Sequence, residues 1–145
     1  MTKHILLSIR PKYIREIEAG IKKFEFRKIL PDTSRLDISK RVIIYCSKPR
    51  MAIIGSFLIK NHLKSDFNSL MKSINADTAY KKRISNYFTN KDSCHALEIS
   101  EFKLYESPLS LSYLRKEHKD FCPGQSYRFL DDLIIKDIKN TNGNL

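Results

Sequence analysis

The first thirty residues switch between two hydrophobic periods. Aliphatic side chains at every second position predict a half-buried strand over 4–9. Pro11 suits the first turn of a helix, and the apolar spacing behind it predicts a helix over 11–19 that ends at Gly20. Alternation returns over 21–28, where phenylalanines occupy one face and charged residues the other. This segment is therefore predicted to be a strand with one charged face.

Two buried strands follow a polar loop. The loop is predicted over 30–40, where proline, aspartate and serine interrupt the apolar pattern. Apolar, β-branched runs predict the strands over 41–46 and 51–59, and the short turn between them predicts that they pair antiparallel. Gly55, inside the second strand, predicts a bulge or a close approach of two backbones.

The middle of the chain changes to a helical period. Its hydrophobic spacing predicts two short amphipathic helices within 65–88, with Ser65 or Asp66 as the cap of the first. Strand character returns over 94–105, and a slip in its phase predicts a bulge near Ser100. The remaining predicted elements are a helical turn over 111–114, a loop at 123–124 and a short strand over 127–130.

The elements follow the order β-α-β-β-β-α-α-β-β, in which strands outnumber helices. Most of the connections suit antiparallel pairing, which favours an α+β fold with a small, strongly bent sheet or barrel and helices at its edge. A chain of 145 residues has the size of one domain. We therefore predict a single domain over 1–132 and a polar C-terminal tail over 133–145.

The composition narrows the class of protein. Hydrophobic residues make up 41% of the chain and charged residues 30%, which is the balance of a globular protein. No apolar stretch approaches the roughly 18 residues that a membrane-spanning helix needs, so no membrane is expected as a partner. The three cysteines, Cys46, Cys94 and Cys122, are widely spaced, which fits buried thiols in a reducing cytoplasm better than a disulfide framework.

The chain is strongly basic, with a net charge of +11. Residues 1–50 carry 13 Lys and Arg against 5 Asp and Glu, whereas residues 101–145 carry 7 of each. An excess of this kind favours RNA, another nucleic acid or a nucleotide as the partner, with a merely solubilising surface as the alternative.

The segment Gly20-Ile21-Lys22-Lys23-Phe24-Glu25-Phe26-Arg27 carries the densest chemistry. On an extended strand Glu25 and Arg27 share a face, whereas Lys22 points to the other face and reaches a common pocket only from the preceding turn. A carboxylate beside two cations can hold a polar ligand through charge-assisted hydrogen bonds. The alternative is an exposed salt bridge worth about 0–1 kcal/mol.

The pattern GxKxxExR, which follows LLSIRPKYIREIEA, resembles the ASCH (activating-signal-cointegrator homology) domain, a relative of the PUA fold. Further stretches are similar to small stand-alone prokaryotic ASCH proteins: VIIYCS at 42–47, IGSF at 54–57 and PGQSYRF at 123–129. The resemblance spans most of 4–130. It implies a PUA-like small β-barrel with flanking helices, and a cleft beside the first helix that is lined by Lys22, Glu25 and Arg27.

The resemblance also implies a connection with RNA. ASCH proteins are described as modules that bind or process RNA, and some members are ribonucleases. One bacterial branch hydrolyses N4-acetylcytidine with a threonine nucleophile at the position of Glu25. A glutamate can act as a general base but replaces a hydroxyl nucleophile poorly, so this chain departs from that branch.

Other side chains could extend the site. Ser47 could hydrogen-bond a base, and on the resemblance alone Gln125 is expected to face a ligand. A basic rim for a phosphate backbone could be formed by Arg10, Lys12, Lys48, Arg50 and Arg128. Aromatic residues could either stack on a base or belong to the core: Tyr13, Phe26, Tyr45 and Tyr127. The four histidines lack metal-ligand spacing and no cofactor motif is present, so neither a metal nor a cofactor is predicted.

Three hypotheses remain open. The first is a domain that binds RNA or a nucleotide through Lys22, Glu25 and Arg27. The second is a hydrolase, either a ribonuclease or an amidohydrolase of a modified nucleoside, with Lys22 or Glu25 as the general base. The third is a regulatory module that contacts another protein through the helices at 65–88. For the first two, the ligand class spans RNA, DNA and free nucleosides.

Overall fold

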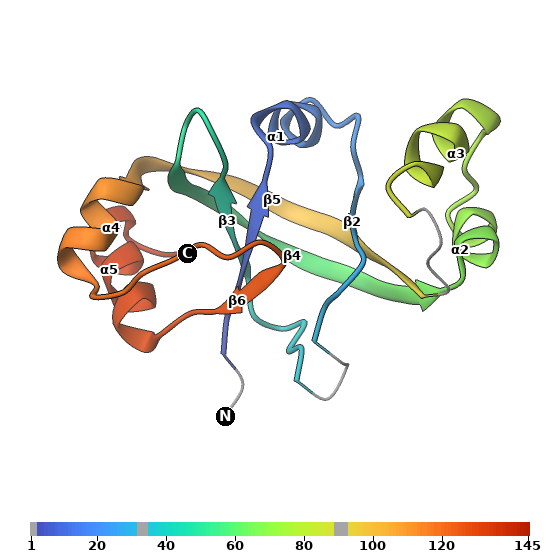
Figure 1. Ribbon diagram of the computed structural model, residues 1–145. Helices are drawn as coiled ribbons and strands as arrows, with labels where there is room; N and C mark the ends of the chain where they lie inside the picture. Colours follow the sequence, from blue (N-terminus) through green and yellow to red (C-terminus); the bar gives the residue numbers. More distant parts are fainter. Residues whose placement is uncertain (1–2, 32–34, 89–92) are drawn as a thin grey trace.

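Six strands pair into one sheet in the order β2-β5-β4-β3-β1-β6, and the sheet curls into a half-barrel (Figure 1). The computed structural model describes residues 3–31, 35–88 and 93–145. The strands are β1 (Ile5–Ile9), β2 (Phe24–Arg27), β3 (Val42–Cys46), β4 (Ala52–Ser65), β5 (Cys94–Ser110) and β6 (Tyr127–Phe129). The helices are α1 (Pro11–Glu18), α2 (Phe67–Ser73), α3 (Thr78–Ser85), α4 (Leu111–Glu117) and α5 (Asp132–Asn142). This is the α+β architecture that the sequence predicts.

β1 pairs in parallel with β3, and every other neighbouring pair in the sheet is antiparallel. The β3–β4 pair confirms the prediction that was based on the short turn. A parallel pair needs a crossover connection, and α1 and β2 lie within the one that joins β1 to β3. Part of the loop predicted over 30–40 lies outside the described residues, at 32–34.

Both predicted irregularities of the sheet are present. At Gly55 the register of β4 shifts, and a side chain added there would overlap the carbonyl oxygen of Lys103. Glycine is therefore the residue that lets the two backbones approach. In β5 the register shifts again between Ser100 and Lys103, where Glu101 has a φ of 47°.

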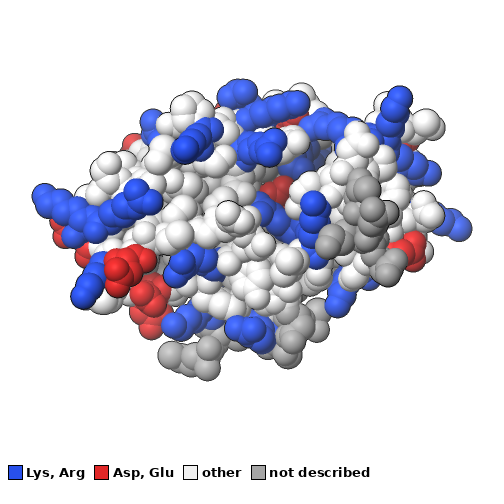
Figure 2. Space-filling model, in the orientation of Figure 1, with Lys and Arg blue, Asp and Glu red and all other residues white. Residues whose placement is uncertain are grey.

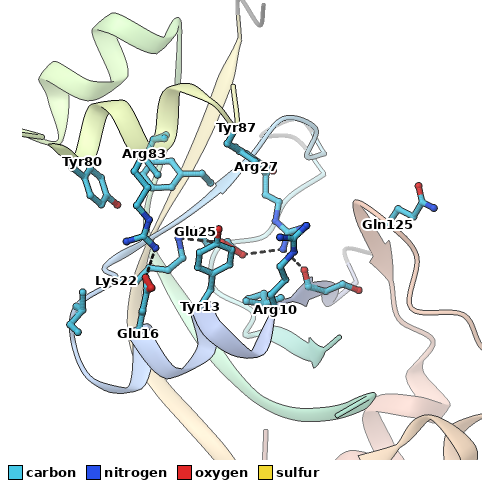
Figure 3. A pocket seen from close by; sticks show the side chains of 15 residues that line it. Arg10, Tyr13, Glu16, Lys22, Glu25, Arg27, Tyr80, Arg83, Tyr87 and Gln125 are labelled. Atoms are coloured by element: carbon cyan, nitrogen blue, oxygen red, sulfur yellow. Dashed lines mark hydrogen bonds and ion pairs between the residues drawn. The ribbon is translucent and has the colours of Figure 1, made fainter. Parts of the chain in front are cut away.

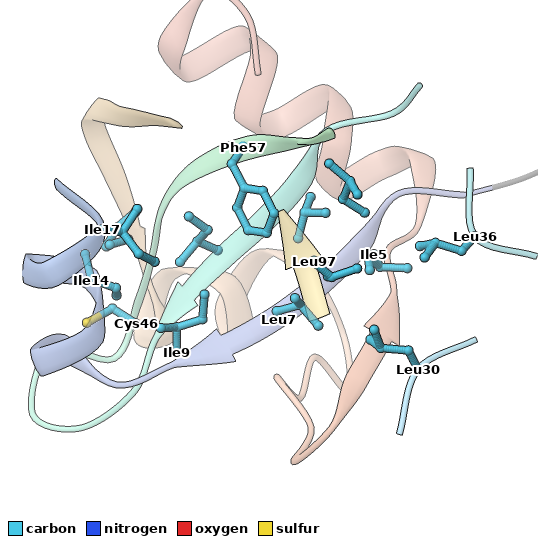
Figure 4. Packing of buried hydrophobic residues seen from close by; sticks show 14 of the residues in the cluster. Ile5, Leu7, Ile9, Ile14, Ile17, Leu30, Leu36, Cys46, Phe57 and Leu97 are labelled. Carbon is cyan, nitrogen blue, oxygen red and sulfur yellow. The ribbon is translucent and has the colours of Figure 1, made fainter. Parts of the chain in front are cut away.

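β1 is buried on both faces, whereas its alternation predicts a half-buried strand. Ile5 and Leu7 belong to the cluster on one face of the sheet, which α1 covers with Ile14 and Ile17 (Figure 4). Leu6 belongs to a second cluster, formed with α4 and α5 on the other face. The prediction is wrong because helices from the far end of the chain cover the second face.

The segment predicted as a polar tail over 133–145 is mostly helical. α5 occupies most of it, and its three isoleucines pack into the second cluster: Ile134, Ile135 and Ile138. The prediction of a tail is wrong because these three apolar residues fall on one helical face, although the segment is polar on average.

The two central helices close the other end of the sheet. The Asp66 carboxylate caps α2, as predicted, by accepting a 2.9 Å hydrogen bond from the backbone N–H of Ser69. Leu70 of α2 and Ile84 of α3 pack against β2 and β5 in a third cluster. The apolar faces of these helices thus pack inside the domain. The third hypothesis, a module that contacts another protein through these helices, therefore loses the observation that supported it. No helix of the described chain is long and apolar enough to cross a membrane.

Two histidines are stacked where β4 and β5 pair. The Nε2 atom of His62 lies 2.9 Å from Nδ1 of His95, and the ring centroids are 5.2 Å apart. Burial lowers the pKa of His95 to about 4, with smaller contributions from His62 and Lys64.

The histidine pair predicts a stability that falls in acid. Between pH 6.5 and about 4 the unfolded chain binds a proton at His95 that the folded chain does not, so the free energy of unfolding decreases as the pH falls. We expect His95→Gln to remove about 2 kcal/mol of that decrease, measured by urea unfolding across this range. An unchanged acid dependence in His95→Gln would contradict the assignment.

Candidate functional site

A cavity of about 370 Å³ lies between α1, β2 and α3 (Figure 3). Its size is within the range of small-ligand sites. Basic, acidic and aromatic side chains share its walls: Ser8, Ile9, Arg10, Tyr13, Glu16, Ile21, Lys22, Glu25, Phe26, Arg27, Tyr80, Arg83, Ile84, Tyr87 and Gln125. The predicted cleft residues Lys22, Glu25 and Arg27 are therefore brought together beside the first helix.

Lys22 enters the cavity from the turn that ends α1. Gly20 has a φ of 77°, and the backbone N–H groups of Ile21 and Lys22 both donate to the carbonyl oxygen of Glu16, at 2.9 and 3.0 Å. This closure reverses the chain before β2 begins, as is common at helix ends that use glycine. Lys22 thus avoids the strand alternation that would have turned it away from Glu25.

Glu25 lies between two cations. One of its oxygens, Oε1, is 3.5 Å from Nζ of Lys22, and Oε2 accepts a 3.0 Å hydrogen bond from the Arg27 guanidinium. No more than about a tenth of any of these three side chains is exposed. Burial lowers the pKa of the Lys22 ammonium, and the nearby Glu25 carboxylate opposes that shift. The exposed salt bridge considered from the sequence is therefore not what the structure contains.

Arg27 links the two ends of the curled sheet. Its guanidinium donates to the carbonyl oxygen of Ser8 in β1 at 2.6 Å, and to that of Ser126, just before β6, at 3.1 Å. Because β2 and β6 are the edge strands, this side chain spans the opening of the half-barrel. Its Nε is enclosed and has no hydrogen-bond partner among the described residues.

Aromatic rings form another part of the cavity wall. Nζ of Lys22 lies 5.3 Å from the centroid of the Tyr13 ring and 5.0 Å from that of Phe26, so the ammonium contacts two π faces. Phe26 is also part of the core, next to Tyr80. Burial raises the pKa of Tyr80 to about 12 and also raises the pKa of Tyr87, so both phenols remain protonated near neutral pH.

An ion pair joins the two helices that border the cavity. Arg83 of α3 donates to Oε1 of Glu16 in α1 at 2.5 Å, and this hydrogen bond raises the pKa of Arg83 further. The Arg83 guanidinium also lies 5.7 Å from the centroid of the Tyr13 ring. Of the three consecutive basic residues at 81–83, Arg83 is the one that lines the cavity.

The residues predicted to extend the site do not all lie in one hollow. Arg10 and Gln125 line the cavity, with Gln125 at the edge away from Lys22 (Figure 3). Ser47 lies instead in a separate groove at the start of α1. Arg128 is exposed on β6 and is not among the residues of either hollow.

Only two of the four aromatic candidates lie at the cavity. Tyr13 and Phe26 line the cavity. Tyr45 is buried in the second cluster, and Tyr127 packs against the first. Neither of these two tyrosines is a wall of the cavity.

Sequence reasoning missed three of the charged and aromatic cavity residues: Glu16, Tyr80 and Tyr87. The spacing of Tyr80 and Tyr87 marks one face of the second amphipathic helix, but it does not say what that face meets. Glu16 and Arg83 are 67 positions apart, so only the folded chain brings them together. Among residues 3–31, 35–88 and 93–145, no group of three or more His, Cys, Asp and Glu is placed to hold a metal ion.

Basic side chains surround the mouth of the cavity. Figure 2 shows Lys and Arg gathered over α1 and around a hollow in which an acidic side chain is visible. The described surface therefore attracts anions toward a site that contains a carboxylate.

Comparisons with known proteins give the class of the fold. No protein-family model matches the chain. An "ASCH domain-containing ribonuclease" of Zymomonas mobilis is 24% identical over 129 residues, which cover 88% of this chain and 84% of that protein. The crystal structure of ASCH from Zymomonas mobilis superimposes with a TM-score of 0.83 at 22% identity, over 98% of this chain and 97% of that one. The N-terminal domain of Staphylothermus marinus McrB shares the fold more distantly, with a TM-score of 0.63 at 13% identity over 97% and 94% of the two chains.

The curled sheet with a cavity beside α1 is thus the α+β fold of an ASCH domain. The chain is an ASCH-domain protein, homologous to the Zymomonas protein over nearly its full length. The resemblance noted in the sequence is confirmed.

The contacts of Arg27 predict a specific loss of stability. Arg27→Lys keeps a positive charge but cannot reach Glu25 and the two carbonyl oxygens together, so buried acceptors lose their donors. We expect the free energy of unfolding to fall by about 2–3 kcal/mol in a urea titration. The control Arg115→Lys, at an exposed position on α4, should change it by no more than about 0.5 kcal/mol. Equal stability of the two variants would contradict the role of Arg27 in closing the sheet.

Proposed function

We propose that this protein cleaves single-stranded RNA in the cavity between α1, β2 and α3. The observation that carries the proposal is the buried Lys22–Glu25–Arg27 chain at the floor of a cavity with aromatic walls and a basic mouth. Homology to a protein named as a ribonuclease supports turnover in addition to binding. The net charge of +11 supports a polyanionic substrate.

The aromatic walls suit an unpaired nucleotide. Bases in single strands are recognised by stacking on tyrosine and phenylalanine rings and on guanidinium planes. Tyr13, Tyr80 and Tyr87 supply such rings, and Arg83 supplies a guanidinium. Because the Arg83–Glu16 ion pair joins α3 to α1 across the site, a single nucleotide fits this space better than a base pair does.

The charged groups suit cleavage by the RNA's own 2′-hydroxyl. In that reaction the 2′-oxygen bonds to the adjacent phosphorus and the bond from phosphorus to the 5′-oxygen breaks, which leaves a 2′,3′-cyclic phosphate and a 5′-hydroxyl. We assign Glu25 as the base that takes the 2′-hydroxyl proton and Lys22 as the acid that protonates the 5′-oxygen. Burial lowers the pKa of Lys22, which makes its ammonium a better proton donor than an exposed lysine.

Arg27 has a different role in this proposal. Its terminal nitrogens already bond two backbone carbonyls and Glu25, so we assign it as a positioning residue for the carboxylate. We assign the contacts with phosphate to Arg10 and Arg83, which also line the cavity and lie nearer its exposed rim.

A cleavage assay tests the proposal. End-labelled single-stranded RNA is incubated with the parent, Glu25→Gln and Lys22→Met, in EDTA and in magnesium, and the products are separated on a denaturing gel. Losing a positioned acid or base lowers rates by about 100-fold or more, so both variants should cleave at least that much more slowly. The control Glu117→Gln, exposed on α4, should cleave like the parent.

Two outcomes would overturn the proposal. Parent protein that retards RNA on a native gel but forms no product in either buffer would be a binding domain without turnover. Folded Glu25→Gln and Lys22→Met variants that both cleave at the parent's rate would place the reaction elsewhere. Thermal unfolding of each variant, followed by circular dichroism, separates loss of chemistry from loss of fold.

A further inference from the structure

A second, open groove adjoins the cavity at the start of α1. It is lined by Arg10, Pro11, Lys12, Arg15, Ser47, Lys48 and Pro49. Four of these seven residues are cationic and none is acidic. The groove is therefore a basic surface without an acidic residue, in contrast to the cavity, which contains two glutamates.

The topology explains why these residues meet. β1 and β3 are parallel, with Ile9 opposite Cys46, so the segments that follow them emerge at the same edge of the sheet. After β1 comes α1, and after β3 comes the turn at 47–50. The backbone N–H of Ser47 donates to the carbonyl oxygen of Ile9 at 3.0 Å, which holds the turn beside the helix.

The cations of the groove have no internal counter-charge, unlike three of the four cations of the cavity. In the cavity Lys22, Arg27 and Arg83 each pair with a glutamate. Among the residues that the structure describes, the side chains in the groove form no ion pair with Asp or Glu: Arg10, Lys12, Arg15 and Lys48. Like charges gathered in this way repel one another, and an extended polyanion relieves that repulsion.

Arg10 lines both hollows, so a strand with one nucleotide in the cavity can continue into the groove without leaving the basic surface. We propose that this groove binds the backbone phosphates of the nucleotides next to the one in the cavity. The substrate class is then a single-stranded RNA of several nucleotides, in preference to a free nucleotide. This inference rests on the proposed function for the identity of the strand, but its test is separate.

A salt titration of binding tests the groove. The probe is fluorescein-labelled 2′-O-methyl octauridylate, which lacks the attacking hydroxyl, and its affinity is measured by anisotropy at several salt concentrations. Each phosphate contact to a single strand contributes about 0.7 to the slope of log K against log salt. The triple variant Lys12→Gln/Arg15→Gln/Lys48→Gln should therefore lower the slope by about 2, with about a tenfold or greater loss of affinity at low salt.

A matched control removes the same charge elsewhere. Lys116→Gln/Lys119→Gln/Lys136→Gln changes three exposed lysines on and beside α4 and α5, none of which lines the cavity or the groove. We expect this variant to bind within about twofold of the parent, because its lysines do not contact the strand. A second probe, the 2′-O-methyl dinucleotide of uridine, should lose less affinity than the octamer in the groove variant.

Two results would overturn the inference. One is a groove variant with the parent's slope and affinity for the octamer. The other is salt-sensitive binding to phosphatidylserine vesicles that the groove variant loses while it binds the octamer normally, which would make this surface a membrane contact. By contrast, groove-dependent binding by a parent protein that never cleaves RNA would refute the proposed reaction and support the groove.

Discussion

The guanidinium of Arg27 is the contact on which the shape of the site depends. Arg27 belongs to the edge strand β2, and its guanidinium donates hydrogen bonds to the backbone of β1 and of the segment before β6. It therefore holds the two edges of the curled sheet together. The same group fixes the Glu25 carboxylate. Taking such charges out of water is costly, and hydrogen bonds to both partners are what offset that cost. Closure of the sheet and placement of the carboxylate are therefore one interaction.

Positive charge is paired with carboxylates in the cavity but not in the groove beside it. In the cavity Lys22, Arg27 and Arg83 are paired with Glu16 or Glu25, which suits the handling of protons at one nucleotide. At the groove beside it the cations have no such partner, which suits a backbone that brings its own negative charge. Arg10 belongs to both. Part of the net charge of +11 thus lies at the proposed reaction site and part at the proposed strand-binding groove.

Local patterns in the sequence predict most of the elements and the central motif. Alternation, the Asp66 cap and the glycine at 55 are short-range signals, and each corresponds to a feature of the structure. The reach of Lys22 from the turn could also be anticipated. Local patterns do not show which distant segment packs against an element. The packing of α5 on the second face of β1 and the pairing of Arg83 with Glu16 both depend on contacts between segments far apart in the sequence. For the same reason, the sequence does not show that Ser47 and Arg128 lie outside the cavity.

The central claim is that RNA occupies the cavity between α1, β2 and α3, and amide chemical shifts test it most directly. The ¹⁵N-labelled protein is titrated with the 2′-O-methyl dinucleotide of uridine, and each shifted amide is mapped on the fold. Our account predicts that the largest shifts lie at the start of α1, along the turn that carries Lys22 and β2, and on α3 near Arg83. Shifts confined to α4 and α5, or saturation with no change around Glu25, would contradict it.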